Sequence, residues 1–128
     1  MGFYKKEKTY PGQHDLSVII PKFTEMLQQD KWRVQDKTEN DRAVVQAMKV
    51  GFLRGLIAAD RALTFTFDQT SGDLHLNVGV GKWLGNIAIT AIEVIFLSDL
   101  FIFVDVPEML WTEHVENDVL QKLDLIVQ

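Results

Sequence analysis

Cysteine is absent from the 128 residues of this chain. The absence excludes disulfide bonds, thiolate metal sites and cysteine nucleophiles, and it is typical of proteins in a reducing compartment. The N-terminal sequence MGFYKK also lacks the apolar core of a signal peptide. We therefore expect a cytoplasmic location.

Positive charge is in short supply. The chain has 13 Lys and Arg residues against 18 Asp and Glu residues, which gives a formal net charge of -5 and an isoelectric point near 5.1. Phosphate backbones repel such a chain, so we expect no nucleic-acid partner. A weak basic cluster, Lys5, Lys6 and Lys8, is interrupted by Glu7 and is typical of a solvated edge strand.

The remaining composition is that of an ordinary globular protein. Hydrophobic residues make up 47% of the chain and charged residues 24%, so extensive disorder is not expected. No internal repeat, low-complexity segment or linker divides the sequence. Because the length suffices to bury a core, we predict a single α+β domain over residues 1–128.

Alternating apolar and polar residues predict a sheet. The pattern occurs over residues 32–37, 43–50, 63–67 and 74–80, and a shorter strand is expected within residues 3–10. Short polar turns join these segments, which predicts antiparallel pairing, since parallel strands need long crossovers. The apolar face of the sheet is expected to carry Trp32, Leu63, Phe65, Phe67, Leu74, Leu76 and Val78.

A helix is expected between the first two strands. Ile19, Phe23 and Leu27 share one helical face, and the helix should end near residues 29–30. Asp15 or Ser17 is a candidate N-cap. Pro21 suits a first turn, so the alternative is a helix that begins near Ile20.

An apolar run over residues 87–106 follows the glycine-rich stretch 79–85. We favour a buried helix that covers the apolar face of the sheet, over two strands joined by a turn at Ser98 and Asp99. A membrane span is the third alternative, although Glu93 and Asp99 are costly in lipid. Pro107 suits the first position of a further helix that extends to the C-terminus.

The predicted fold class is therefore α+β. An antiparallel sheet of four to five strands packs against an N-terminal helix and one long or two consecutive C-terminal helices.

Two elements suggest chemistry, and both have a simpler structural interpretation. Gly79, Gly81 and Lys82 resemble part of a phosphate-binding loop, but the first glycine of that motif is missing and Trp83 replaces its Ser or Thr. We interpret them as a tight corner in which Trp83 caps the core. An acidic segment holds Glu113, His114, Glu116 and Asp118, but its helical spacing points the pairs in different directions. We expect no metal and no cofactor.

Catalytic groups are sparse as well. The three histidines, His14, His75 and His114, stand apart in the sequence and lie in no nucleophile motif. Glu93 lies inside the apolar run, where it is either an acid with a raised pKa or the ion-pair partner of Arg54 or Arg61. An enzyme is the least favoured hypothesis.

The segment 73–84, a strand that leads through Gly-x-Gly-Lys-Trp into an apolar run, resembles a group of small uncharacterised prokaryotic domains. Residues 44–47 and 51–55 are similar to the same group. The resemblance implies an α+β architecture and no activity.

Our leading hypothesis is a non-catalytic protein-interaction module that forms a homodimer through residues 87–106. The candidate interface residues are Ile92, Ile95, Phe101, Phe103 and Trp111. The first alternative is a binder of an apolar ligand or acyl chain between sheet and helix. Its candidate lining residues are Phe65, Phe67, Trp83, Glu93 and Phe96. The second alternative is peripheral membrane contact through the same run.

Overall fold

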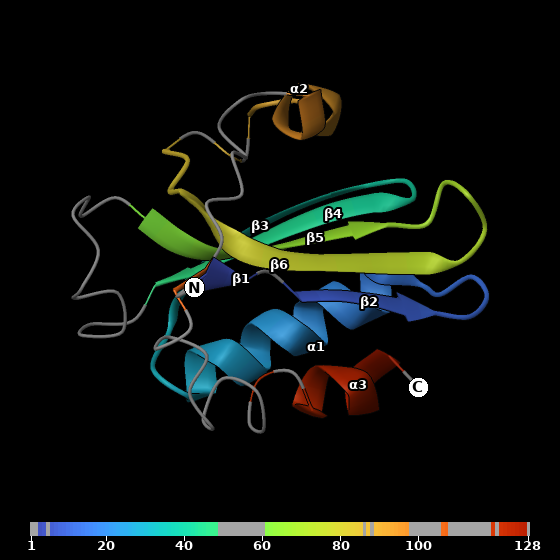
Figure 1. Cartoon of the computed structure of the whole chain (residues 1–128), viewed down its shortest axis with the longest axis horizontal. Coiled ribbons are helices and arrows are strands. Elements are labelled where there is room, and N and C mark those ends of the chain that lie inside the picture. Colours follow the sequence, from blue (N-terminus) through green and yellow to red (C-terminus); the bar gives the residue numbers. More distant parts are fainter. Residues whose placement is uncertain are drawn as a thin grey trace.

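A computed structural model describes residues 3–4, 6–48, 61–85, 87, 89–97, 106–107, 119 and 121–127. Its centre is an antiparallel sheet with the strand order β2-β6-β5-β4-β3 (Figure 1). The strands are β2 (Lys6–Tyr10), β3 (Arg33–Glu39), β4 (Arg42–Met48), β5 (Arg61–Asp68) and β6 (Leu74–Lys82). Two short strands, β1 (Phe3–Tyr4) and β7 (Val106–Pro107), pair with each other. The predicted antiparallel sheet and α+β class are confirmed.

Strand register divides the side chains of the sheet between two faces. Val45 pairs with Phe65, which pairs with Val78, and these side chains share one face because alternate residues of a strand point the same way. We call this the α1 face. Val44, Gln46 and the residues opposite them point to the other side, which we call the α2 face. Residues 43–47 are all buried, so the inner strand β4 is covered on both faces.

The helix α1 (Leu16–Gln29) packs against β3 and β4 on the α1 face. Asp15 is its N-cap, and the Oδ1 atom accepts a hydrogen bond from the Ser17 backbone N–H at 3.0 Å. This cap satisfies the first turn, so the helix begins at Leu16, and the alternative start near Ile20 is wrong. Pro21 lies exposed inside the helix, where it removes only one backbone hydrogen bond.

The α1 face holds the main core. Phe23 of α1 meets Phe65 and Phe67 edge-on, with ring centres 4.9 and 6.1 Å apart. The helix α3 (Gln121–Val127) adds Leu123 and Val127 to the same buried cluster. All seven side chains expected on the apolar face belong to this cluster: Trp32, Leu63, Phe65, Phe67, Leu74, Leu76 and Val78.

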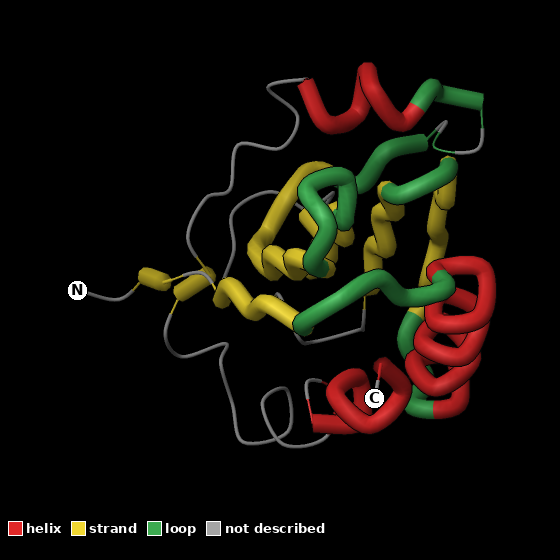
Figure 2. The backbone as a smooth tube through the Cα atoms, turned by 90° about the vertical axis from the view of Figure 1, so that its right-hand side faces the viewer, coloured by secondary structure: helices red, strands yellow, loops and turns green. Residues whose placement is uncertain are grey.

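The cover of that face differs from the expectation. Residues after β6 cross to the opposite side, where Leu84, Ile87 and Ile95 form a second buried cluster with Val44. Figure 2 shows the sheet between α2 (Ile92–Leu97) on one side and α1 with α3 on the other. For its described part, residues 87 and 89–97, the prediction that the run covers the apolar face is therefore wrong, because α1 and α3 already fill that face.

The sequence left open one long or two consecutive C-terminal helices, and the described residues contain two, α2 and α3. The Glu39 Oε2 atom accepts a hydrogen bond from the Ile92 backbone N–H at 3.0 Å, and α2 begins there. Turns occupy Ile87 and the positions just before α2, so one long helix from 87 is wrong; residues 98–105 lie outside the described part. Pro107 lies in β7 and does not begin a helix, while residues 108–118 are again outside the description. Proline is tolerated in such a short edge strand.

Candidate interaction surface at the hairpin end of the sheet

The structure places the predicted ligand-lining residues on both sides of the sheet. Phe65 and Phe67 are fully buried on the α1 face. Trp83 is half-buried after β6, with the Arg33 guanidinium carbon 4.9 Å from its ring centre. Glu93 is exposed on α2, and the side chain of Phe96 is outside the described part. Phe65 and Phe67 are thus not brought together with Trp83 and Glu93 around one site.

Two of the predicted interface residues are interior. Ile92 and Ile95 are 3% and 1% exposed. They are buried by the chain itself, on the α2 face of the sheet. Phe101, Phe103 and Trp111 fall outside the residues that the structure describes. Within the described part of the apolar run, Ile89 is a large apolar residue that is exposed, with 83% of its surface accessible to solvent.

The corner after β6 is held by a buried amide network. Gln46 is fully buried on β4, and its Oε1 atom accepts hydrogen bonds from the Leu84 backbone N–H at 3.0 Å and from Gln35 Nε2 at 2.8 Å. Gln35 Nε2 also donates to the Leu84 carbonyl at 2.7 Å, and Gln46 Nε2 donates to Thr64 Oγ1 at 3.2 Å. No helix begins at Lys82, so the described corner does not form the helix N-terminus that a phosphate-binding loop needs. Its interpretation as a structural corner is favoured.

A second buried amide joins three loops at the other end of the sheet. Gln69 is 4% exposed. Its Oε1 atom accepts from the His14 backbone N–H at 2.9 Å, and its Nε2 atom donates to the His14 carbonyl at 2.7 Å and to Asp41 Oδ1 at 3.3 Å. The Gln69 backbone N–H donates to the Asp41 carbonyl at 2.9 Å. The start of α1 and the β3–β4 turn are thereby fixed to the β5–β6 turn.

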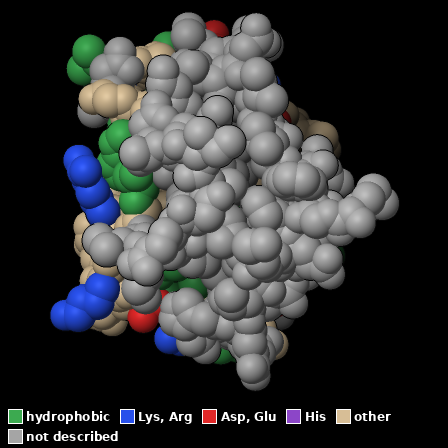
Figure 3. All heavy atoms as spheres, turned by 60° about the vertical axis from the view of Figure 1, so that its left-hand side comes forward, with side chains coloured by type: hydrophobic (Ala, Val, Ile, Leu, Met, Phe, Trp, Pro, Cys, Tyr) green, Lys and Arg blue, Asp and Glu red, His purple; other side chains and the backbone are tan. Residues whose placement is uncertain are grey.

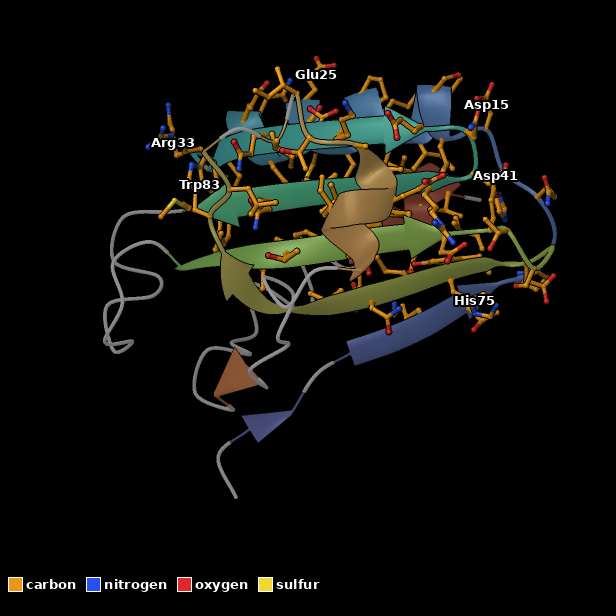
Figure 4. The ribbon with its side chains drawn as sticks, turned by 90° about the horizontal axis from the view of Figure 1, so that it is seen from above. Asp15, Glu25, Arg33, Asp41, His75 and Trp83 are labelled. Carbon is orange, nitrogen blue, oxygen red and sulfur yellow. The ribbon has the colours of Figure 1, made fainter. Side chains whose placement is uncertain are left out.

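Two clefts flank the β3–β4 turn at this end. The larger, of about 550 Å³, lies between the start of α1 and β3 and includes His14 and Thr38 in its wall. The smaller, of about 360 Å³, lies between the turn and the start of α2 and includes Thr70. Asn40 and Asp41 line both clefts. Figure 4 shows Asp15 and Asp41 at this end of the sheet, with Arg33 and Trp83 at the opposite end.

Carboxylates dominate the charge of the two clefts. Five of them are contributed by the described residues, and together they define the acidic hairpin end: Asp15, Asp36, Glu39, Asp41 and Glu93. The guanidinium in the smaller cleft, that of Arg42, already has its Nε atom 3.7 Å from Asp68 Oδ2. Lys37 Nζ lies 3.7 Å from Oε1 of Glu39. Further Lys and Arg side chains lie along one edge of the molecule in the view of Figure 3.

The five carboxylates differ in how far the chain itself uses them. Asp15 caps α1, Glu39 caps α2 and Asp41 accepts from Gln69. Asp36 and Glu93 have no hydrogen bond or ion pair within the described residues. Asp36 keeps exposed surface, yet desolvation by the neighbouring chain raises the pKa of its carboxyl. A cation beside Asp36 would offset that cost.

His14 and His75, the histidines in the described ranges, do not form a metal-binding group with these acids. His14 Nε2 lies 3.1 Å from the Pro11 carbonyl, and His75 Nδ1 lies 3.1 Å from Thr9 Oγ1. Within the described ranges, no three His, Asp or Glu side chains are placed to hold a metal ion. His114 and the acidic segment around it lie outside those ranges. The arrangement at the hairpin end is suited to attracting positive charge.

Sequence reasoning did not find this surface. Its acids come from three separate stretches, and the sequence shows Asp15 as a helix cap, Asp36 as a strand residue and Glu93 as an acid inside the apolar run. The one available signal was a polar residue in the turn after β5, Gln69, which is 4% exposed. Such residues are buried only when they have hydrogen-bond partners.

Comparison with known proteins adds no relative. No protein-family model, curated protein or solved structure matches the chain. The resemblance of segment 73–84 to small prokaryotic domains therefore stays a prediction. Among the described helices, none has both the length and the apolar character needed to cross a membrane.

Proposed function

We propose that this chain is a non-catalytic protein-interaction module that binds a basic segment of its partner at the acidic hairpin end. The observation that carries the proposal is the convergence of Asp15, Asp36, Glu39, Asp41 and Glu93 on two adjacent clefts. Complementary charge steers a partner to such a surface and aligns it there. The cytoplasm is the proposed location, which the lack of cysteine supports.

Asp36 and Glu93 are the residues for a decisive experiment. Both carboxylates are exposed, and neither one caps a helix. The double variant Asp36→Asn with Glu93→Gln should therefore fold normally. It should bind a fluorescein-labelled octa-arginine peptide about tenfold more weakly than the wild type, measured by anisotropy at low ionic strength.

The matched control is Glu25→Gln, which removes an exposed carboxylate from α1, away from the hairpin end (Figure 4). It should leave binding of the peptide unchanged. Equal weakening by Glu25→Gln would show that only the net charge of -5 attracts the peptide, and the proposal would be wrong. A wild-type chain that does not bind the peptide would also contradict it.

A homodimer is the second candidate, and Ile89 favours it. This side chain is 83% exposed immediately before α2, and exposed apolar side chains at one place mark a contact surface when others join them. Light scattering over a range of concentrations, with and without a mild detergent, would measure the solution mass. A detergent-insensitive dimer that Ile89→Asp converts to a monomer is expected; a wild-type monomer would exclude this candidate.

The described part of the structure gives no support to an apolar-ligand site or to peripheral membrane contact. Of the residues proposed to line an apolar ligand site, Phe65 and Phe67 lie on the opposite face of the sheet from Trp83 and Glu93, and the clefts that flank the β3–β4 turn are rich in polar groups. For peripheral membrane contact, the described residues provide the single exposed Ile89 from the apolar run.

A further inference from the structure

Two helices share the α1 face of the sheet, and they are held differently. The helix α1 lies against β3 and β4 at one side of this face. The helix α3 lies beside α1 and reaches the opposite edge strand, β2, through Asp124 (Figure 2). The apolar side chains of Leu74 and Leu76 on β6, paired with β2, belong to the cluster that α3 helps to close.

The contact between α3 and β2 is a charged one at the rim of the core. Lys8 Nζ donates to the two carboxylate oxygens of Asp124 at 3.0 and 2.8 Å. The Tyr10 hydroxyl donates to Asp124 Oδ1 at 2.5 Å. Lys8 lies opposite Leu76 in the register, so its side chain starts on the α1 face, where an ammonium group needs an anion beside it. Lys8 and Tyr10 together form a receptor for one carboxylate.

The helix α3 is the less firmly held of the two covers. Its described part, Gln121–Val127, buries the side chains of Leu123 and Val127, and its order depends on docking these side chains to the rest of the chain. Its docking is provided by the buried side chains of Leu123 and Val127, by Val119 just before it, and by an ion pair whose partners are 31% and 30% exposed. A part-exposed pair of this kind stabilises weakly. By contrast, α1 has 14 residues, an N-cap and five buried side chains.

We infer that the groove between α1 and β2 is a helix-binding site, which α3 occupies within the chain and which a partner helix takes over by displacing α3. The partner helix carries the pattern of α3: apolar side chains at the positions of Leu123 and Val127, four residues apart, and a carboxylate directly after the first. Residues at that spacing lie on one face of a helix. Lys8 and Tyr10 receive the carboxylate of the partner as they receive that of Asp124.

This binding site differs from the acidic hairpin end, because it selects an acidic helix in place of a basic segment. The two adjoin at Tyr10, whose ring lies edge-on to that of His14 in the larger cleft, with ring centres 6.4 Å apart. The tethered α3 competes with an effective concentration on the order of millimolar. A natural partner helix therefore has to be longer than α3 and make further contacts along α1. The groove thus combines an interaction surface with its own intramolecular competitor.

A peptide with the sequence of residues 117–128 tests the inference in the full-length protein. Labelled with fluorescein, it should bind the wild-type chain weakly, measured by anisotropy. It should bind the Asp124→Asn chain about fivefold more tightly, because the weakened α3 of that chain competes less. A peptide that itself carries Asp124→Asn should bind either chain about fivefold more weakly than the unchanged peptide.

Hydrogen exchange provides an independent measurement on the same proteins. Amides of residues 121–127 should exchange faster than those of α1 in the wild type, and faster still in Asp124→Asn. The control Glu25→Gln should change neither exchange of α3 nor binding of the peptide. These results together would support the inference.

Three results would overturn it. The first is no binding of the peptide to either chain, and the second is equal binding of the two peptides. The third is a wild-type dimer in light scattering that the peptide dissociates, because the site would then hold α3 of a second copy in place of a partner helix.

Discussion

Buried amides are the residues whose placement is most specific in this protein. Gln46 and Gln69 are both almost fully buried, and each joins segments that are distant in sequence. A buried amide is tolerated because its donors and acceptors are satisfied, and it is costly when they are not. These two residues therefore decide how the corner after β6 and the loops at the hairpin end are fixed to the sheet.

Replacing Gln46 should destabilise the fold. The substitution Gln46→Leu leaves the buried Leu84 backbone N–H without its acceptor, which should lower the free energy of unfolding by about 1–3 kcal/mol. Urea denaturation measures the loss. The matched control, Gln28→Leu at an exposed position of α1, should change stability by less than about 0.5 kcal/mol. Equal stability of the two variants would contradict the role of the network.

Titration of Tyr10 is expected to lower the stability of the fold at alkaline pH. Burial raises the pKa of its hydroxyl above the ordinary value of 10.0, and the hydrogen bond to Asp124 and the charge of that residue raise it further. The unfolded tyrosine releases its proton near pH 10 while the folded one keeps it. The stabilisation is therefore complete below pH 10.0 and is lost as the pH rises toward the folded pKa.

The variant Tyr10→Phe removes the titrating group. Its free energy of unfolding should fall less steeply than that of the wild type between about pH 9 and about pH 11. Chemical denaturation at a series of pH values measures the two slopes. Parallel slopes would mean that Tyr10 titrates in the folded protein as it does in the unfolded chain.

At the scale of elements, the turns determine which strands pair. The β5–β6 turn contains Gly72 with φ +115°, a backbone conformation that side chains with a Cβ rarely adopt. Asp68 supports the same turn by accepting hydrogen bonds from the Thr70 backbone N–H and hydroxyl at 2.9 and 2.7 Å. The turn brings β6 back beside β5 and places Gln69 where it holds the hairpin end together.

Two glycines provide a matched pair for this element. A Cβ added at either Gly72 or Gly85 would meet no atom within 4 Å. The two sites therefore differ in backbone conformation, since only Gly72 has a positive φ. Gly72→Ala should lower the free energy of unfolding by about 1–2 kcal/mol, because alanine is strained at this φ. Gly85→Ala should have little effect. Thermal unfolding measures both variants, and a tolerated Gly72→Ala would show that the turn rearranges without cost.

At the scale of the whole molecule, the sheet is a middle layer with a cover on each side. The α1 face is closed by α1 and α3, and the α2 face by α2 and the corner after β6 (Figures 1 and 2). The two proposed binding surfaces lie at different parts of this layered structure. Basic segments are expected at the hairpin end, and an acidic helix is expected in the groove that α3 covers.

Closure of the main core by α3 can be tested with two leucines of the same helix. Leu123 is fully buried and Leu125 is 72% exposed. Leu123→Ala should lower the free energy of unfolding by about 2–5 kcal/mol through the cavity that it leaves. Leu125→Ala should change it by less than about 0.5 kcal/mol. If both variants match the wild type in urea denaturation, α3 does not contribute to the cooperative core.

Much of the fold could be predicted because its signals are local. The hairpin of β3 and β4, the strand β6 and the cap at Asp15 follow from alternation, turn residues and side-chain chemistry within a few positions. The candidate site could not be predicted in this way. Asp36 and Glu93 are 57 positions apart in the sequence and line different clefts, and only the packing of α2 beside the β3–β4 turn brings the two clefts to the same end of the sheet.

The sequence by itself determined the α+β class, the antiparallel pairing and the membership of the main core, because these depend on periodicity and short connections. Only the tertiary structure decided which side of the sheet the apolar run covers. Residues 43–47 of β4 are buried on both faces of the sheet, so the pattern of this strand does not specify which face the apolar run packs against. The choice was made by α1 and α3, which fill the α1 face, and by Gln46, which holds the corner on the other.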